Sequence, residues 1–266
     1  MKHIKPYKIF ESTSLNFPTT REEVIEVCNR YRINNYTIND DLSIDVEGHV
    51  NLAYKNLEYL PLRFNYVSGD FSCYDNKLKT LEGCPQTVSG SFDCNRNKLK
   101  TLEGCPQTVS GSFDCSNNKL ESLEGCPQTV DGNFDCYRNK LITLEGSPSV
   151  VNGNLICYVN ELETLEGSPK TINGNFLCFV NKLKDLEYFP EVSDYINIRD
   201  NPVNLLVYTF IENEETDSFM IEDFIDYEIV RNGNTVMLDR LQTFIRDNDL
   251  EMPDLEEIKK HYKIIE

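Results

Sequence analysis

The sequence predicts a repeat solenoid, in which short parallel strands stack coil upon coil between a cap at each end. A 21-residue unit occurs six times in succession, and the copies begin at Ser68, Ser89, Ser110, Asp131, Asn152 and Asn173. The same apolar positions recur in every copy, and helix-type patterns flank the array on both sides. At a period of about 20 residues, each unit buries its apolar face only against its neighbours. The chain therefore offers a ladder-like surface, which favours binding over catalysis.

One copy is expected to form one coil. In the copy SGSFDCNRNKLKTLEGCPQTV, Phe92 and Cys94 alternate as in a short strand with one buried face. Leu99 and Leu102 follow as inward residues of the return side. The sequence Gly104-Cys105-Pro106 then turns the chain, because glycine permits unusual dihedral angles and proline fixes φ.

An asparagine follows the strand in every copy, and these residues are Asn76, Asn97, Asn118, Asn139, Asn160 and Asn181. Buried polar groups need partners, so a stack of asparagines would satisfy the backbone at each bend. The resulting N-x-L-x-x-L segment resembles the short leucine-rich repeat, over about 160 of the 266 residues. This resemblance implies a leucine-rich-repeat-like stack of about eight short parallel strands, although cysteine replaces leucine at the last strand position. A parallel β-helix is the alternative fold.

The array is predicted to extend beyond the six clear copies. Gly48 lies 21 residues before Gly69, and the apolar residues after it fit a decayed first copy. The segment from Val192 to Leu206 repeats the pattern with one residue deleted. We therefore expect an N-terminal cap over residues 1–44, a solenoid of about eight coils over residues 45–206, and an acidic, mainly helical C-terminal cap or small domain over residues 207–266.

Both flanking regions are predicted to contain helices. Thr20 and Glu23 fit a capping box at the start of a helix over about residues 20–31. We expect this helix to cover the open end of the first coil with an apolar stripe of Val24, Ile25, Val27, Cys28 and Tyr31. After the array we expect helices near residues 205–210, 218–225, 241–245 and from 253, with a strand or hairpin over residues 228–238.

Nine of the ten cysteines obey the repeat. One column contains Cys73, Cys94, Cys115, Cys136, Cys157 and Cys178, and the other contains Cys84, Cys105 and Cys126. Stacked in register, these side chains are expected to be buried, reduced thiols that act as small hydrophobic residues. Oxidation of some of them and metal binding are the alternatives, but the chain has no C-x-x-C motif and only three histidines. Buried thiols favour a reducing compartment.

Composition narrows the possible functions. The chain has 44 acidic and 26 basic residues, a net charge of −18, which disfavours binding to nucleic acids or anionic membranes. No apolar run of 18 residues and no signal-type start is found, so we expect a cytoplasmic protein. No nucleophile, base or phosphate-binding motif has a recognisable spacing, so we expect neither an enzyme nor a cofactor. A protein of unknown identity is the expected partner, and the oligomeric state is left open.

The outward strand positions vary between copies, and we expect them to line one concave sheet. The first four copies are polar there, with an aspartate row at Asp93, Asp114 and Asp135. The last two copies are apolar or aromatic there, and together with Tyr137 of the fourth copy the candidate residues are Tyr137, Ile156, Tyr158, Val159, Leu177, Phe179 and Val180. An apolar patch of this size predicts either a docked partner protein or a cover formed by the C-terminal segment.

The near-identity of the copies, with their E-G-C-P-Q-T-V endings, is similar to uncharacterised repeat proteins of large tailed bacteriophages. The resemblance implies a protein of the host cytoplasm without a defined activity. Our hypothesis is a non-catalytic protein–protein interaction module that binds a host or phage protein, in host takeover or counter-defence. The alternatives are a structural component of the virion or its assembly, and an acidic inhibitor that mimics nucleic acid.

Overall fold

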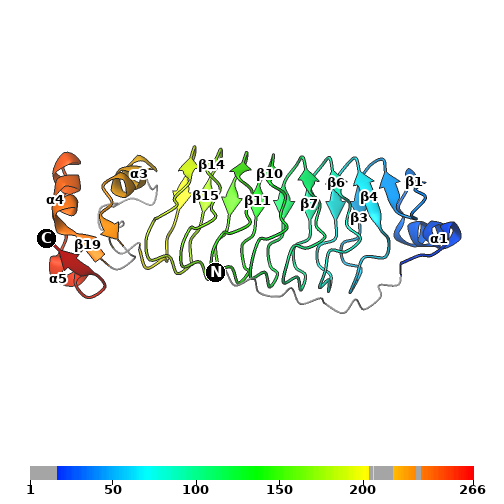
Figure 1. Cartoon of the computed structure of the whole chain (residues 1–266), viewed down its shortest axis with the longest axis horizontal. Coiled ribbons are helices and arrows are strands. Elements are labelled where there is room, and N and C mark those ends of the chain that lie inside the picture. Colours follow the sequence, from blue (N-terminus) through cyan, green and yellow to red (C-terminus); the bar gives the residue numbers. More distant parts are fainter. Residues whose placement is uncertain (1–16, 204–205, 207–217, 232–234) are drawn as a thin grey trace, which may run out of the picture.

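A computed structural model describes residues 17–203, 206, 218–231 and 235–266. Figure 1 shows an elongated body, in which a long stack of coils lies between a helical cap and a small C-terminal module. The predicted repeat solenoid is therefore confirmed. The stack runs along a nearly straight axis in this view.

The solenoid contains two sheets that run along its length (Figure 1). The nine-stranded sheet consists of β1 (Tyr36–Ile38), β2 (Ile44–Val46), β4 (Phe64–Val67), β6 (Thr87–Val88), β8 (Thr108–Val109), β10 (Thr129–Val130), β12 (Val150–Val151), β14 (Thr171–Ile172) and β16 (Glu191–Val192). The eight-stranded sheet consists of β3 (Val50–Asn51), β5 (Phe71–Ser72), β7 (Phe92–Asp93), β9 (Phe113–Asp114), β11 (Phe134–Asp135), β13 (Leu155–Ile156), β15 (Phe176–Leu177) and β17 (Ile196–Asn197). Equivalent strands pair in parallel, as Phe92 does with Phe113, while β1 pairs antiparallel with β2.

The eight-stranded sheet matches the predicted stack of about eight parallel strands, but the second sheet was not predicted. The segment that ends each unit, such as Thr108–Val109, forms a strand of its own. Only one residue of this strand is buried, so its pattern is too short to show an alternation. Each coil therefore contributes one strand to each of two sheets. In this respect the solenoid is similar to a parallel β-helix, which was the alternative prediction.

A glycine column allows the chain to turn from one sheet to the other. A Cβ atom built on Gly111 would lie 2.8 Å from the carbonyl carbon of Gly90 in the preceding coil and 2.7 Å from the backbone nitrogen of Ser91. These distances are shorter than any real Cβ contact. The corner therefore requires glycine because neighbouring coils stack backbone against backbone.

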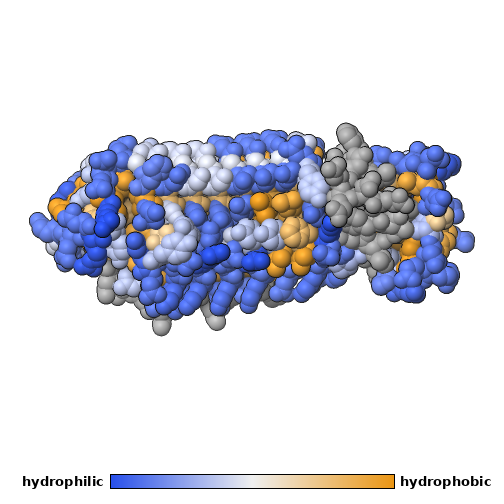
Figure 2. Space-filling view, turned by 180° about the vertical axis from the view of Figure 1, so that it is seen from behind, coloured by the Kyte–Doolittle hydropathy of each residue, from blue (hydrophilic) through white to orange (hydrophobic). Residues whose placement is uncertain are grey.

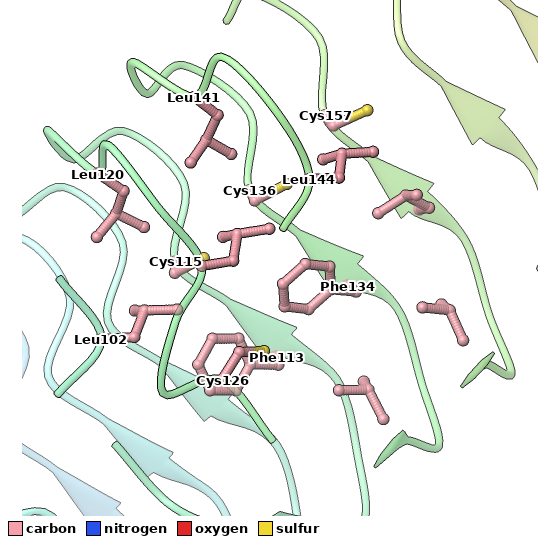
Figure 3. Close-up of a cluster of buried hydrophobic side chains, with 14 of the residues drawn as sticks. Leu102, Phe113, Cys115, Leu120, Cys126, Phe134, Cys136, Leu141, Leu144 and Cys157 are labelled. Atoms are coloured by element: carbon pink, nitrogen blue, oxygen red, sulfur yellow. The ribbon is translucent and has the colours of Figure 1, made fainter. Parts of the chain in front are cut away.

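The core is a set of identical columns. Figure 3 shows Phe113 and Phe134 side by side, with leucines and cysteines of neighbouring coils around them. The stacked phenylalanine rings lie 5.3 Å apart between Phe92 and Phe113 and 5.7 Å apart between Phe113 and Phe134. All three rings are fully buried, as are Leu99 and Leu102 on the return side. The inward positions that were read from the sequence are therefore confirmed.

The asparagine ladder is also confirmed. The amide nitrogen of Asn118 donates to the carbonyl oxygen of Cys115 in its own coil and to that of Cys94 in the preceding coil, both at 3.1 Å. Its Oδ1 accepts a hydrogen bond of 3.0 Å from the backbone N–H of Leu99. The same pattern recurs along the column, and each asparagine thus joins two adjacent coils.

The cysteines lie where the repeat predicts. All ten are buried and unpaired, and those of the first column have no exposed surface. Burial raises the pKa of the Cys105 thiol to about 12 and that of Cys28 to about 11. These thiols are therefore packing groups with little thiolate character at neutral pH.

The N-terminal helix α1 (Arg21–Tyr31) begins as predicted. Thr20 caps it, since its side chain accepts a hydrogen bond from the N–H of Glu23. The carboxylate of Glu23 accepts from the N–H of Thr19, one residue earlier than a capping box requires. Ile25 is 44% exposed, so its place in the predicted apolar stripe was wrong, whereas Val24 and Cys28 are buried against the first coil.

The C-terminal module contains α3 (Ser218–Asp226), α4 (Leu238–Asp247), α5 (Leu255–Ile258), β18 (Val230–Arg231), β19 (Thr235–Met237) and β20 (Lys263–Ile265). The predicted hairpin is confirmed by the antiparallel pairing of β18 with β19. Strand β20, which pairs in parallel with β19, was not predicted. The helix predicted near residues 205–210 lies outside the described residues, except for the buried Leu206.

Candidate binding surface on the eight-stranded sheet

The outward side chains of the eight-stranded sheet form one surface, which we call the strand face. It consists of the residue between the buried Phe and Cys of each coil and the two residues after the Cys. Because successive side chains of a strand point to opposite faces, burial of Phe113 and Cys115 turns Asp114 outward. The strand face was expected to be concave, but the axis of the stack is nearly straight in Figure 1.

The structure brings the aspartate row together. Asp93, Asp114 and Asp135 are direct partners on adjacent parallel strands. The carboxylate of Asp114 accepts hydrogen bonds from the N–H of Ser116 at 2.9 Å and from the side-chain amide of Asn95 at 2.8 Å. In contrast, Oδ1 of Asp135 is buried without a hydrogen-bond partner among the described residues.

Partial burial changes the charge of this row. Loss of solvent raises the pKa of Asp93 to about 6 and that of Asp135 to about 7. The neighbouring carboxylate of Asp114 adds a smaller upward effect in both cases. At neutral pH the row therefore carries less negative charge than three ionised aspartates would.

The aromatic positions form a continuous ring ladder. The rings of Tyr137 and Tyr158 stack with centroids 4.6 Å apart and planes 15° apart. Tyr158 and Phe179 stack at 4.4 Å and 9°. Ile156 and Leu177 pair directly across β13 and β15. They form the neighbouring row of the strand face, two residues before Tyr158 and Phe179. The structure thus gathers the seven apolar residues that the sequence singled out into one area.

We call this area the apolar end of the strand face, and its residues are Tyr137, Ile156, Tyr158, Val159, Leu177, Phe179 and Val180. Apolar surface gathers toward the C-terminal end of the solenoid in Figure 2. Val159 is 36% exposed and Val180 is 41% exposed, so neither side chain is part of the core.

The backbone at these two valines is unusual. Val159 has a φ of 53° and Val180 a φ of 54°, in the left-handed region that β-branched residues avoid. The equivalent residues of the preceding coils share this conformation, and they are Tyr54, Asp75, Arg96, Asn117 and Arg138. Of these, aspartate and asparagine tolerate it best. The hydrogen bond from the N–H of Val159 to the carbonyl oxygen of Phe179, at 3.1 Å, holds the conformation. The two valines therefore suit neither the core nor the local backbone.

The C-terminal module packs against the end of the stack. The hydroxyl group of Tyr262 in the module donates to the carbonyl oxygen of Pro202 in the last coil at 3.0 Å. A cavity of about 800 Å³ lies between the last coil and the module, lined by Tyr188, Val203, Phe224 and neighbouring residues. The predicted cover over the apolar end was the C-terminal segment, of which residues 204, 205 and 207–217 lie outside the described residues.

Sequence reasoning missed one feature of the strand face. At its N-terminal end, Tyr54 and Tyr74 pair edge to face beside the end of α1 and line a second cavity. Tyr54 lies 21 residues before Asp75, at a position that varies between copies, so the repeat pattern gives no signal for this pair.

No protein-family model matches the chain, and no curated protein matches it. Within the described ranges, none of the helices has the length and apolar character that a membrane crossing requires.

Proposed function

We propose that the protein is a non-catalytic protein–protein interaction module that binds its partner through the strand face. The observation that carries this proposal is the pair of exposed valines in left-handed backbone at Val159 and Val180. The left-handed conformation belongs to every coil, so what needs a reason is the choice of a β-branched residue for it at these two positions. Packing does not require these two, because more than a third of each side chain is exposed. Contact with a partner supplies the missing reason.

The ring ladder favours a polypeptide partner. Tyr137, Tyr158 and Phe179 use their ring faces on one another, so the ladder presents mainly ring edges to solvent. Nucleic-acid bases bind to proteins by stacking on open ring faces, which this ladder has only at its two ends. Apolar and aromatic side chains of a protein can pack against ring edges and the flanking valines. A net charge of −18 also opposes an anionic partner at this surface.

The sequence resemblance supports a phage origin and a host or phage protein as partner, in host takeover or counter-defence. Ten buried, unpaired cysteines support a reducing compartment such as the host cytoplasm. The nucleic-acid mimic is less well supported, because the raised pKa values of Asp93 and Asp135 reduce the charge of the one carboxylate row on the strand face.

Affinity purification of the tagged full chain from infected bacteria tests the proposal. The variants Tyr158→Asn and Phe179→Asn introduce a residue type that a preceding coil carries at the same position, Asn95, so the coil should still fold. We expect each to weaken binding of the captured protein by about 2 kcal/mol or more, since aromatic anchors dominate interfaces. Lys140→Gln, an exposed change on the same coil as Tyr137 but outside the strand face, is the matched control.

Equal capture by the wild type, both aromatic variants and the control would show that the partner does not use the apolar end. Loss of capture with unchanged circular dichroism would support the proposal.

A further inference from the structure

A cavity of about 420 Å³ lies at the N-terminal end of the strand face, between the end of α1 and the first coils. Its lining includes three tyrosines and three basic residues, which are Tyr31, Tyr54, Tyr74, Arg32, His49 and Lys55. Ligand cavities in proteins have volumes of roughly 300–1,000 Å³, so this one can hold a small organic molecule. It lies at the opposite end of the strand face from the apolar end.

Helix termination builds one wall of this cavity. Arg32 ends α1 in the left-handed conformation with a φ of 58°, and its N–H bonds to the carbonyl oxygens of Asn29 and Cys28. The N–H of the buried Ile33 also bonds to Cys28, at 2.9 Å. The carbonyl groups of Cys28 and Asn29 are therefore satisfied, and the turn leaves Tyr31 and the Arg32 side chain beside the first coil.

The opposite wall offers an open aromatic face. Tyr54 and Tyr74 meet with ring centroids 4.8 Å apart and planes 77° apart, and Tyr54 is 64% exposed. In an edge-to-face pair, the ring that supplies its edge keeps both of its own faces free for stacking. The ring ladder of the apolar end lacks this property, because its rings are parallel and in contact.

The lining of this cavity carries charge of the opposite sign to the chain, while Asp70, Asp75 and Asp93 lie behind its His49 and Tyr74. The chain has 44 acidic residues against 26 basic ones, yet the residues that line this cavity include no aspartate or glutamate. His49 is already partnered, with its Nδ1 3.0 Å from the backbone nitrogen and 3.2 Å from Oδ2 of Asp70. Within the part of the chain that the structure describes, Arg32 and Lys55 form no ion pair. Two exposed cations thus converge on an aromatic cavity.

We propose that this cavity binds an organic anion with an aromatic body, of the aryl phosphate or aryl carboxylate class. Arg32 and Lys55 would bind the anionic group, since guanidinium and ammonium groups form strong charge-assisted hydrogen bonds to phosphate and carboxylate. The aromatic body would stack on the free tyrosine face. The two cations would repel a cationic ligand. A neutral ligand would offer no negative charge to pair with them.

Titration of the full-length ¹⁵N-labelled protein with phenyl phosphate, followed by NMR, tests the proposal. We expect saturable shifts confined to residues near Tyr31, Arg32, Tyr54 and Lys55. Arg32→Gln and Lys55→Gln should each weaken binding about tenfold, because each removes one hydrogen bond to a charged group. Lys98→Gln, an exposed change of the same charge on another coil, should leave the affinity unchanged.

Two further probes separate the parts of the proposal. Benzyl alcohol, the neutral aromatic probe, and inorganic phosphate should each bind at least about tenfold more weakly than phenyl phosphate, since each lacks one half of the interaction. A phosphotyrosine peptide that binds more tightly than phenyl phosphate would identify a protein-borne anion, and a weaker one would identify a free small molecule. Either result supports the anion site.

The proposal is overturned if phenyl phosphate causes no saturable shifts, or if its affinity is the same in Arg32→Gln, Lys55→Gln and the wild type. It is also overturned if inorganic phosphate binds as tightly as phenyl phosphate, because the aromatic cavity would then contribute nothing.

Discussion

Replacement of Asp135 by asparagine should stabilise the protein at alkaline pH and leave its stability unchanged at acidic pH. Asp135 lies partly buried on the strand face, and its Oδ1 has no hydrogen-bond partner among the described residues. Burial first, and then the charges of Asp114 and Asp93, raise its pKa from 3.8 to about 7. Asparagine has nearly the same shape but never carries the charge that the site disfavours.

The sign follows from the raised pKa. In the unfolded chain Asp135 ionises near its ordinary value of 3.8, whereas in the folded protein it ionises near 7. Its contribution to stability is thus fully present below the ordinary value and is lost as pH rises through about 7. A difference of about three pH units corresponds to about 4 kcal/mol, and partial solvent exposure reduces this to about 2 kcal/mol. We therefore expect Asp135→Asn to raise the unfolding free energy by about 2 kcal/mol at pH 8.

Urea unfolding at pH 4, close to the ordinary pKa of 3.8, and at pH 8 checks this prediction. The chain contains no tryptophan, so far-ultraviolet circular dichroism is the suitable probe. Asp131→Asn is the matched control, since it removes the same negative charge at an exposed corner of the same coil. A stabilisation of equal size at both pH values, or an equal effect of the control, would refute the reasoning, because neither depends on a raised pKa at Asp135.

Three further predictions concern the repeat. Asn118→Ala should lower the unfolding free energy by about 2 kcal/mol, because it leaves the N–H of Leu99 without a partner and removes one of the two asparagine hydrogen bonds to each of the carbonyl groups of Cys94 and Cys115; Asn152→Ala, at an exposed corner, should change it by less than about 1 kcal/mol in the same urea experiment. Thiol titration without reductant should detect few of the ten buried cysteines in the native protein and nearly all after denaturation, and several disulfides would contradict both the packing role and the reducing compartment. Gly111→Ala should lower the midpoint of thermal unfolding, since its methyl group would lie 2.8 Å from the backbone of Gly90, and an unchanged midpoint would show that the corner can relax.

Sequence periodicity predicted the parts of the fold that each coil repeats. Phe113, Cys115 and Asn118 recur at one residue per unit, so register alone places them in columns. The second sheet was missed because its strand, as in Thr108–Val109, has two residues and one buried side chain. Strand β20 was missed because it pairs with β19, which precedes it by more than 20 residues, and no local pattern marks that pairing.

In the candidate site, too, the repeat predicted some features and could not predict others. Register predicted that Tyr137, Tyr158 and Phe179 lie side by side, and the structure gives the ring stacking. The raised pKa of Asp135 depends on how much of its carboxylate the neighbouring coils cover, which a sequence does not state. The N-terminal cavity combines residues of α1 with those of two separate coils, so no single motif indicates it.

The combined stability and affinity of the double variant Val159→Asn/Val180→Asn test the binding role of the strand face most directly. Asparagine tolerates left-handed backbone better than valine, so the unfolding free energy should stay equal or rise by about 1 kcal/mol for each site. Affinity for the captured partner should fall at least about tenfold, because two apolar contacts are lost at the centre of the proposed interface. Reduced stability together with unchanged affinity would contradict the account, since the valines would then serve the fold and not the partner.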